Sequence, residues 1–258
     1  MGTRRGLTRA RRLVVKVGSG QITSPGEGLD SRRIAALAAD ISALVDDRRE
    51  VVLVSSGAIV AGTARLGLSA KRRSIPERQA AAAVGQSSLM WHYEQAFKRH
   101  GITVGQVLLT SQDISDRGRY LNARNTLLAL LDFRVLPVVN ENDTVAVEEI
   151  KVGDNDNLAA LVAHLIDADL LVLLTDVDGL YSADPRRDTS ATRIDTVEAV
   201  TEDIRRLCFD EAGRVSVGGM ITKLEAAQKA AASGIPMVIA NGREHGILGR
   251  LLRVNNPE

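Results

Sequence analysis

The sequence predicts an α/β protein whose mainly parallel sheet is covered by helices on both faces. Short apolar runs of strand type alternate with helical patterns along the whole chain. The runs are nearly continuous in apolar residues, which is typical of strands buried on both faces. Strands separated by helical segments favour parallel pairing. With no internal repeat and no low-complexity linker, we predict one continuous domain.

The expected elements follow one another in a regular order. The expected strands span residues 13–17, 51–55, 102–109, 134–139, 170–175 and 237–240. Apolar residues at helical spacing predict helices over residues 29–47, 59–66, 76–98, 117–131, 156 to about 166, and 222–232. Asp30 or Ser31 is the expected N-cap of the first of these helices. Pro76 suits a first helical turn. One of residues 154–156 is expected to cap the helix that follows it.

Composition excludes several classes of function. The 258 residues carry a net charge of +1 and only 3% aromatic residues, which argues against nucleic-acid and membrane-surface partners. The lone Cys208 cannot form an internal disulfide, and a reducing cytoplasm is the natural compartment. No apolar run approaches the roughly 20 residues that span a bilayer.

The N-terminal segment is basic. Residues 1–12 contain five arginines, and Lys16 interrupts the next apolar run, so no apolar signal core follows. We therefore expect residues 1–12 to be a flexible basic arm and residues 13–258 to be a single domain.

Polar residues gather where the expected strands end. In parallel α/β folds, small ligands bind beyond the carboxyl ends of the strands. The residues at these ends are Lys16, 18–20, 55–57, 140–143, Thr175 and Asp176. They include neither histidine nor cysteine, so a zinc site and a Cys/His nucleophile are excluded there, and no metal ligands are assigned.

The most informative stretch is residues 135–157, where a buried strand leads into two polar clusters. The clusters contain Glu141, Asn142, Asp143, Asn155 and Asp156, with Lys151 between them. Turns and helix caps account for two or three such residues. The remainder indicate a binding or catalytic site.

Two lysines favour binding of an anion. Lys16 lies in a buried strand beside glycines, where lysine is rare unless it is paired or used; the alternative is an edge lysine that extends to solvent. Lys223 lies in the first turn of a helix after 218–219, where the helix N-terminus also attracts anions; the alternative is an ordinary solvated lysine. Neither a Walker A loop nor a GxGxxG motif is present.

Lysines, glycine turns and acids together suit phosphoryl transfer, because its catalysis depends on positioning and on stabilising negative charge. Asp156 is expected to hold both ammonium groups. Ser56, Asp143 and Asn155 are candidates for binding a polar substrate. Thr175 and Asp176 are candidates for contact with a nucleotide.

Longer segments resemble the glutamate 5-kinases of the amino acid kinase family. The similarity covers nearly the whole chain, and the segment PVVNENDTVAVEEIKVGDNDNLAALVA is its most specific part. The matching segments lie at residues 14–19, 55–62, 82–90, 105–110, 121–131, 137–163, 173–186 and 218–227.

The resemblance implies a three-layer α/β/α sandwich, the amino acid kinase fold, with the glutamate site mainly in the N-terminal half and the ATP site mainly in the C-terminal half. It implies ATP- and Mg²⁺-dependent phosphorylation of the side-chain carboxylate of L-glutamate to L-glutamyl 5-phosphate, the first step of proline synthesis in the cytoplasm. Free proline is the implied inhibitor, and a homo-oligomer, dimer or tetramer, is implied.

The resemblance also implies roles for individual residues. Lys16, Lys223 and Asp156 match catalytic residues, and Ser56, Asp143 and Asn155 match glutamate-binding residues. The residues matching the ATP site are Lys16, Thr175, Asp176, Val217, Gly218, Gly219, Met220, Ile221, Thr222 and Lys223.

The chain departs from the family at two places. Many members continue into a C-terminal domain of the PUA type, whereas this sequence ends at residue 258 without one, and many have Gly-Thr-Gly-Gly where residues 216–219 read Ser-Val-Gly-Gly. Two other functions stay open: a sister kinase acting on another carboxylate or phosphate, and a non-catalytic amino-acid sensor on the same fold. The sensor predicts loss of Lys16, Lys223 or Asp156, and all three are present.

Overall fold

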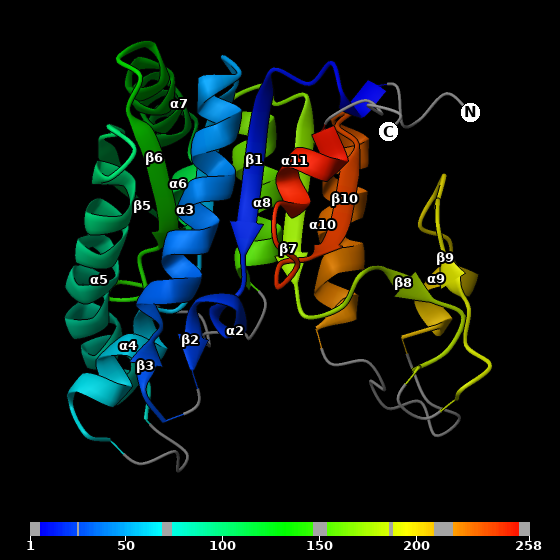
Figure 1. Ribbon diagram of the computed structural model, residues 1–258, viewed down its shortest axis with the longest axis horizontal. Coiled ribbons are helices and arrows are strands. Elements are labelled where there is room, and N and C mark those ends of the chain that lie inside the picture. The colour runs from blue at the N-terminus through cyan, green and yellow to red at the C-terminus, as the bar shows by residue number, and fades with distance from the viewer. Residues whose placement is uncertain are drawn as a thin grey trace.

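The computed structural model describes residues 6–24, 26–68, 74–146, 154–185, 188–208 and 219–252. Its centre is a six-stranded sheet in which every neighbouring pair is parallel, as the sequence predicts (Figure 1). The strand order across the sheet is β10 (Met237–Asn241), β7 (Leu170–Thr175), β1 (Arg12–Val17), β4 (Glu50–Ser55), β6 (Leu136–Glu141) and β5 (Val104–Leu109).

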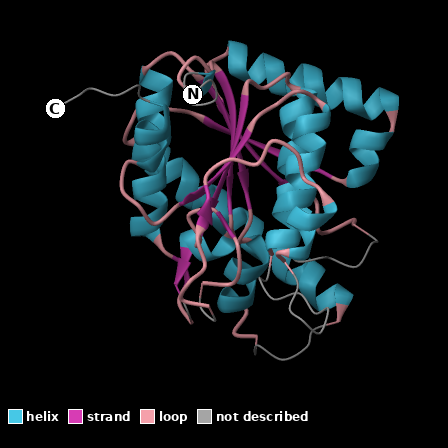
Figure 2. Cartoon of the chain, turned by 90° about the vertical axis from the view of Figure 1, so that its right-hand side faces the viewer, coloured by secondary structure: helices cyan, strands magenta, loops and turns pink. Residues whose placement is uncertain are grey.

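Helices cover both faces of the sheet, which confirms the three-layer arrangement (Figure 2). One face packs against α3 (Ser31–Asp46), α5 (Ile75–Lys98) and α11 (Ile247–Leu252). The other packs against α7 (Arg117–Asp132), α8 (Asp154–Leu165) and α10 (Met220–Ala232). Side chains of β1 point alternately to the two faces of the sheet. Leu13 and Val15 belong to the core beneath α3, α5 and α11, and Val14 belongs to the core beneath α7, α8 and α10.

Helix starts follow the polar signals of the sequence. Asp30 caps α3 by accepting from the backbone N–H groups of Arg32 and Arg33. At α5, Ser74 and Glu77 form a capping box, and a proline follows in the first turn. The helices over 117–131 and 222–232 are confirmed within one or two residues.

Helix α8 differs from the expectation. It begins at Asp154, so residues 154–156 form its first turn and do not cap it. The preceding residue lies outside the described part of the chain. Because residues one apart on a helix differ by about 100° in direction, Asn155 and Asp156 point to different sides.

The basic N-terminal segment is packed over the part that the structure describes. Ala10 is buried, and the backbone N–H groups of Arg11 and Arg12 donate to Asp169. Arg12 already belongs to β1. The expectation of a flexible arm is therefore wrong for residues 10–12.

Short elements that the sequence pattern did not specify complete the described fold. They are α2 (Ser19–Ile22), β2 (Thr23–Ser24), β3 (Gly28–Leu29), α6 (Ser111–Ser115), β8 (Leu180–Tyr181), β9 (Arg193–Ile194) and α9 (Glu202–Arg206). β8 and β9 pair with each other, and a small core containing Leu180, Cys208 and Leu224 lies beneath them. In the part of the chain that the structure describes, no helix is long and apolar enough to cross a membrane.

Two glycines let α4 (Ala58–Arg65) and α5 touch through their backbones. A Cβ added to Gly62 would stand 1.7 Å from the carbonyl oxygen of Ala81, and one added to Gly85 would stand 1.8 Å from that of Ala58. No side chain fits at either place. This contact fixes α5 against the turn that leaves β4.

Candidate active site

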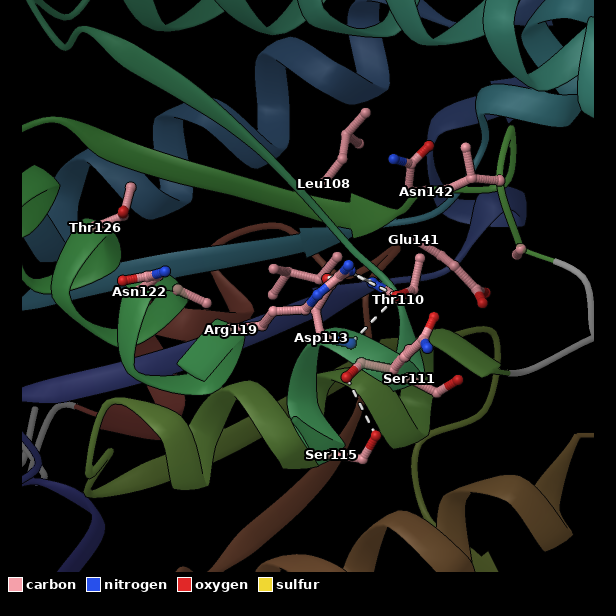
Figure 3. Close-up of a pocket in the computed structure, with 15 residues that line it drawn as sticks. Leu108, Thr110, Ser111, Asp113, Ser115, Arg119, Asn122, Thr126, Glu141 and Asn142 are labelled. Atoms are coloured by element: carbon pink, nitrogen blue, oxygen red, sulfur yellow. Dashed lines mark hydrogen bonds and ion pairs between the residues drawn. The ribbon is translucent and has the colours of Figure 1, made fainter. Parts of the chain in front are cut away.

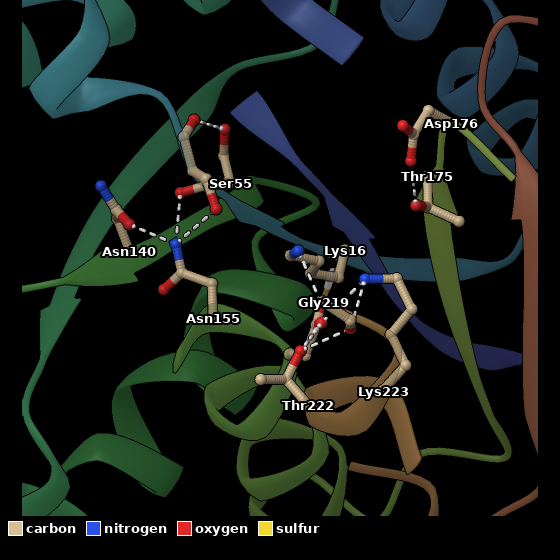
Figure 4. A network of polar contacts seen from close by, with 11 residues as sticks. Lys16, Ser55, Asn140, Asn155, Thr175, Asp176, Gly219, Thr222 and Lys223 are labelled. Atoms are coloured by element: carbon tan, nitrogen blue, oxygen red, sulfur yellow. Dashed lines mark hydrogen bonds and ion pairs between the residues drawn. The ribbon is translucent and has the colours of Figure 1, made fainter. Parts of the chain in front are cut away.

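Several of the predicted site residues lie at the carboxyl ends of the central strands (Figure 4). Lys16 comes from β1, Ser55 from β4 and Thr175 from β7. The first turn of α8 and the start of α10 lie beside them. Polar groups accumulate here because the ends of parallel strands meet at one edge of the sheet.

Lys16, Asp156 and Lys223 form a charged triad. Lys16 Nζ lies 2.6 Å from Asp156 Oδ1, and Lys223 Nζ lies 3.1 Å from Asp156 Oδ2. The relative exposure of the three side chains is 7%, 1% and 12%, respectively. Two ammonium groups on one carboxylate leave one positive charge in excess, so the triad can receive a further anion.

Burial and charge act against each other on these groups. Burial lowers the pKa of Lys16 below its ordinary value, while the charge and hydrogen bond of Asp156 raise it and Lys223 lowers it. Burial alone would raise the pKa of Asp156, yet the charges of both lysines hold it below its ordinary value. Asp156 is therefore ionised at neutral pH, and its charge opposes the loss of a proton from the buried Lys16.

Glycines leave room around both ammonium groups. A Cβ added to Gly18 would stand 3.8 Å from Lys16 Nζ, and one added to Gly219 would stand 3.7 Å from Lys223 Nζ. Gly219 has a φ of 79°, a left-handed conformation that favours glycine. The hydroxyl of Thr222 donates to Asp156 Oδ2 at 2.8 Å. The glycines therefore place no side-chain carbon next to either ammonium group, and the start of α10 with its N–H groups lies beside the triad.

An amide cluster lies on the other side of α8 and consists of Ser56, Asn140 and Asn155. Asn155 Nδ2 donates to Ser56 Oγ at 2.8 Å and to Asn140 Oδ1 at 3.0 Å. Asn140 is 3% exposed. Figure 4 shows Asn155 and Lys16 on opposite flanks of the helix start. The cluster therefore stands next to the triad without sharing its hydrogen bonds.

The other predicted residues take separate places. Asp143 is buried just after β6. At the end of β7, the hydroxyl of Thr175 donates a hydrogen bond to Asp176 Oδ1 at 3.0 Å. Both side chains lie apart from the triad and from Asn155 (Figure 4). Met220 and Ile221 open α10. Lys151, Val217 and Gly218 lie outside the described residues.

Sequence reasoning missed two residues of this region. Asn140 was placed in a polar cluster without a role, although it bonds directly to Asn155. Gln86 was not singled out, although it accepts a hydrogen bond from Asn140 at 2.9 Å. The signal for Asn140 was its place at a strand end, but Gln86 lies within a helix and gives no such signal.

A cavity of about 1080 Å³ lies at the sheet edge beyond β5, next to β6, the strand that carries Asn140 (Figure 3). Thr110, Asp113 and Arg119 line it together with Glu141 and Asn142. Asp113 accepts from the Thr110 hydroxyl and from Arg119, so these three groups already satisfy one another. Glu141 and Asn142 of the polar cluster singled out in the sequence line this cavity, whereas the residues of the charged triad do not.

Comparison with known sequences assigns the family. The profile described as the amino acid kinase family matches residues 11–241. The chain belongs to the amino acid kinase family. Among curated relatives, the glutamate 5-kinase of Ralstonia pickettii is 54% identical over 94% of this chain, that of Pelobacter propionicus 50% over 94%, and that of Nitrosospira multiformis 51% over 96%. The chain spans 65%, 65% and 66% of the lengths of these relatives.

Solved structures share the amino acid kinase fold. A carbamate kinase from Giardia lamblia bound to AMP-PNP aligns with a TM-score of 0.65 at 17% identity and covers 95% of this chain and 97% of its own. A UMP kinase from Bacillus anthracis aligns with a TM-score of 0.64 at 17% identity and covers 94% and 92%. At these identities the likeness concerns the fold alone.

Proposed function

We propose that this chain transfers the γ-phosphoryl group of ATP to the side-chain carboxylate of L-glutamate, as the first step of proline biosynthesis. The observation that carries the proposal is the charged triad at the carboxyl edge of the sheet. Relatives named glutamate 5-kinase, 50–54% identical to this chain, support the choice of substrate. The three catalytic residues expected from the sequence lie together, which the alternative of a sensor without catalysis does not require.

The chemistry needs charge stabilisation more than proton transfer. A carboxylate oxygen of glutamate forms a bond to the γ-phosphorus while the bond from this phosphorus to the bridging oxygen breaks, and ADP leaves with the electron pair. The attacking carboxylate is already ionised, so no general base is required. The obstacle is the repulsion between two anions, which Lys16 and Lys223 reduce by pairing with the phosphoryl oxygens.

Asp156 positions both lysines and is not a proton acceptor in this scheme. Its lowered pKa keeps it ionised, and its two oxygens direct one ammonium group each. Fixed geometry matters because the transferred group spreads its charge over several oxygens. The hydroxyl of Thr222 donates a hydrogen bond to the same carboxylate.

The nucleotide is assigned to the side of the site formed by β7 and α10. Thr175 and Asp176 end β7, and residues 219–223 form the start of α10 with its free N–H groups. We assign Val217 and Gly218 to nucleotide binding as well. The triad then lies between this side and the amide cluster, where a phosphoryl group passes from donor to acceptor.

Mg²⁺ is the expected companion of ATP. Within the described ranges no group of three or more His, Cys, Asp and Glu side chains could hold a metal ion. Mg²⁺ usually keeps several waters and binds through substrate phosphates and one or two carboxylates, so it does not require such a group. When bound, it would neutralise phosphate charge.

Glutamate is assigned to the amide cluster together with Asp143. Ser56 and Asn155 offer a hydroxyl and an amide, and the buried carboxyl of Asp143 follows the same strand as Asn140. We assign Asp143 to the α-ammonium group of glutamate, because a charge pair of this kind selects an amino acid.

The decisive experiment is ADP release with purified protein, ATP, Mg²⁺ and one acceptor at a time. We expect release with L-glutamate and little with acetylglutamate, aspartate or UMP. Turnover with one of these but not with glutamate would identify a sister kinase, and binding of glutamate without any turnover would identify a sensor. Adding free proline tests the expected inhibition, and light scattering tests the expected dimer or tetramer.

A further inference from the structure

Three side-chain amides form a hydrogen-bonded chain from α5 to α8, which we call the amide chain: Gln86, Asn140 and Asn155. Asn140 Nδ2 donates to Gln86 Oε1 at 2.9 Å, and Asn155 Nδ2 donates to Asn140 Oδ1 at 3.0 Å. Gln86 lies 54 positions from Asn140 in the sequence, so the chain links an outer helix to the amide cluster.

One backbone group sets the direction of the amide chain. The N–H of Glu141 donates to Asn140 Oδ1 at 2.9 Å, and a backbone N–H can only donate. Asn140 must therefore direct its NH₂ group to Gln86, whose side-chain oxygen accepts the hydrogen bond. Asn155 must likewise present its NH₂ group to Asn140, which leaves its own oxygen facing away.

The two ends of the amide chain carry complementary groups that still lack partners. Asn155 Oδ1 and Gln86 Nε2 are shielded from solvent, and within the described residues neither has a hydrogen-bond partner. A buried polar atom without a partner is costly, so such atoms indicate places where a ligand completes the bonding. The atom left on Asn155 is an acceptor, and an ammonium group is an ideal donor for it.

Helix α5, which carries Gln86, is packed tightly against the ends of the strands. Gln86 follows Gly85, whose backbone touches that of α4, the helix that begins directly after the Ser56–Gly57 turn. Farther along α5, the hydroxyl of the buried Tyr93 bonds to Ser55 Oγ at 2.7 Å. Helix α5 thus contacts the ends of both β4 and β6 through fixed hydrogen bonds.

We propose that Gln86 is a positioning residue that keeps Asn155 oriented as a hydrogen-bond acceptor for the ammonium group of the amino-acid substrate. Without the Gln86 oxygen, the buried NH₂ group of Asn140 has no acceptor. It gains one if the Asn140 and Asn155 amides both turn over, but the N–H of Glu141 then loses its acceptor. Each orientation then leaves one buried donor without an acceptor, so the orientation that offers the Asn155 oxygen to the ammonium group is no longer the only satisfied one. The inference rests on the proposed function and adds a selector for amino acids over plain dicarboxylates.

The test uses two replacements of similar length. Gln86→Met removes the acceptor, whereas Gln86→Glu keeps an oxygen for Asn140. The two acceptors to compare are L-glutamate and glutarate, which lacks the amino group. We expect Gln86→Met to raise the KM for glutamate about tenfold or more with a smaller effect on kcat, and to leave kcat/KM for glutarate within about threefold. Gln86→Glu should preserve most of the preference for glutamate.

Gln95→Met is the matched control, because Gln95 is exposed on the same helix. It should leave the ratio of kcat/KM for the two acceptors unchanged. An equal loss with both acceptors in Gln86→Met, or an unchanged ratio, would overturn the inference. If Gln86→Met does not fold, Gln86→Glu alone decides, since loss of the preference there contradicts the account. Wild-type protein without activity on glutamate would refute the proposed function itself, and the inference with it.

Discussion

The two halves of the site differ in what they still require from a ligand. In the charged triad, each oxygen of Asp156 already meets an ammonium group, and one positive charge is left over. In the amide chain, every link is neutral, and each end leaves a buried polar atom without a partner. Both halves begin from neighbouring residues of α8.

This difference separates two tasks. A charged and preorganised half suits the transferred phosphoryl group, whose charge must be stabilised without rearrangement. A neutral half with defined donors and acceptors suits recognition of the acceptor molecule, because an unmatched polar atom penalises the wrong ligand. Mutations in the triad should therefore act on kcat, and mutations in the amide cluster should act on the KM for glutamate.

The largest effect is expected for Asp156→Asn. This change leaves two buried ammonium groups with no anion between them, so we expect kcat to fall by about 10²–10³-fold and the protein to lose about 3–5 kcal/mol of stability. ADP release at saturating substrates and thermal unfolding measure the two effects. Asp132→Asn, at the exposed end of α7, is the control and should change neither.

The next largest losses of activity are expected for Lys16→Ala and Lys223→Ala. Each removes one cation that the proposed function assigns to the moving phosphoryl group, and we expect kcat to fall by about 10²-fold or more with a smaller change in the KM for glutamate. Lys229→Ala, on the exposed side of the same helix as Lys223, should stay within about twofold of wild type. An unchanged kcat in either triad variant would remove that lysine from the mechanism.

A smaller and different effect is expected in the acceptor half. Asn155→Ala and Asp143→Ala should raise the KM for glutamate about tenfold or more while the KM for ATP changes little, because both are assigned to the amino acid. Initial rates with each substrate varied in turn give both constants. Asn157→Ala, whose side chain bonds to Glu225 and Lys229 of α10, is the control. A rise confined to the KM for ATP would reverse the assignment of the two halves.

The sequence was sufficient for the sheet and for much of the site. Continuous apolar runs predicted the parallel strands, and the position of polar residues at strand ends predicted that Lys16, Ser56 and Asn140 would lie at the same edge of the sheet. Asp156 was assigned to both lysines from chemistry alone, and the structure brings these groups to 2.6 and 3.1 Å.

The remaining features depend on contacts that no local pattern contains. Gln86 reaches the site only because Gly62 and Gly85 allow two helix backbones to touch, which requires the packed fold. The sequence placed the N-cap of α8 within residues 154–156, whereas the helix already begins at Asp154. Asn and Asp favour both caps and chain turns, so residue type alone does not fix the residue at which the helix begins.

The central claim is that Asp156 sustains a positive charge on Lys16 in a buried position where Lys223 also repels it. NMR titration of the Lys16 ammonium group measures this directly. In the wild type we expect a pKa below the ordinary 10.5, because burial lowers it. Asp156→Asn should lower the pKa further, since the carboxylate raises it, and Lys223→Met should raise it, since the second lysine lowers it. A pKa that is the same in all three proteins would contradict the account.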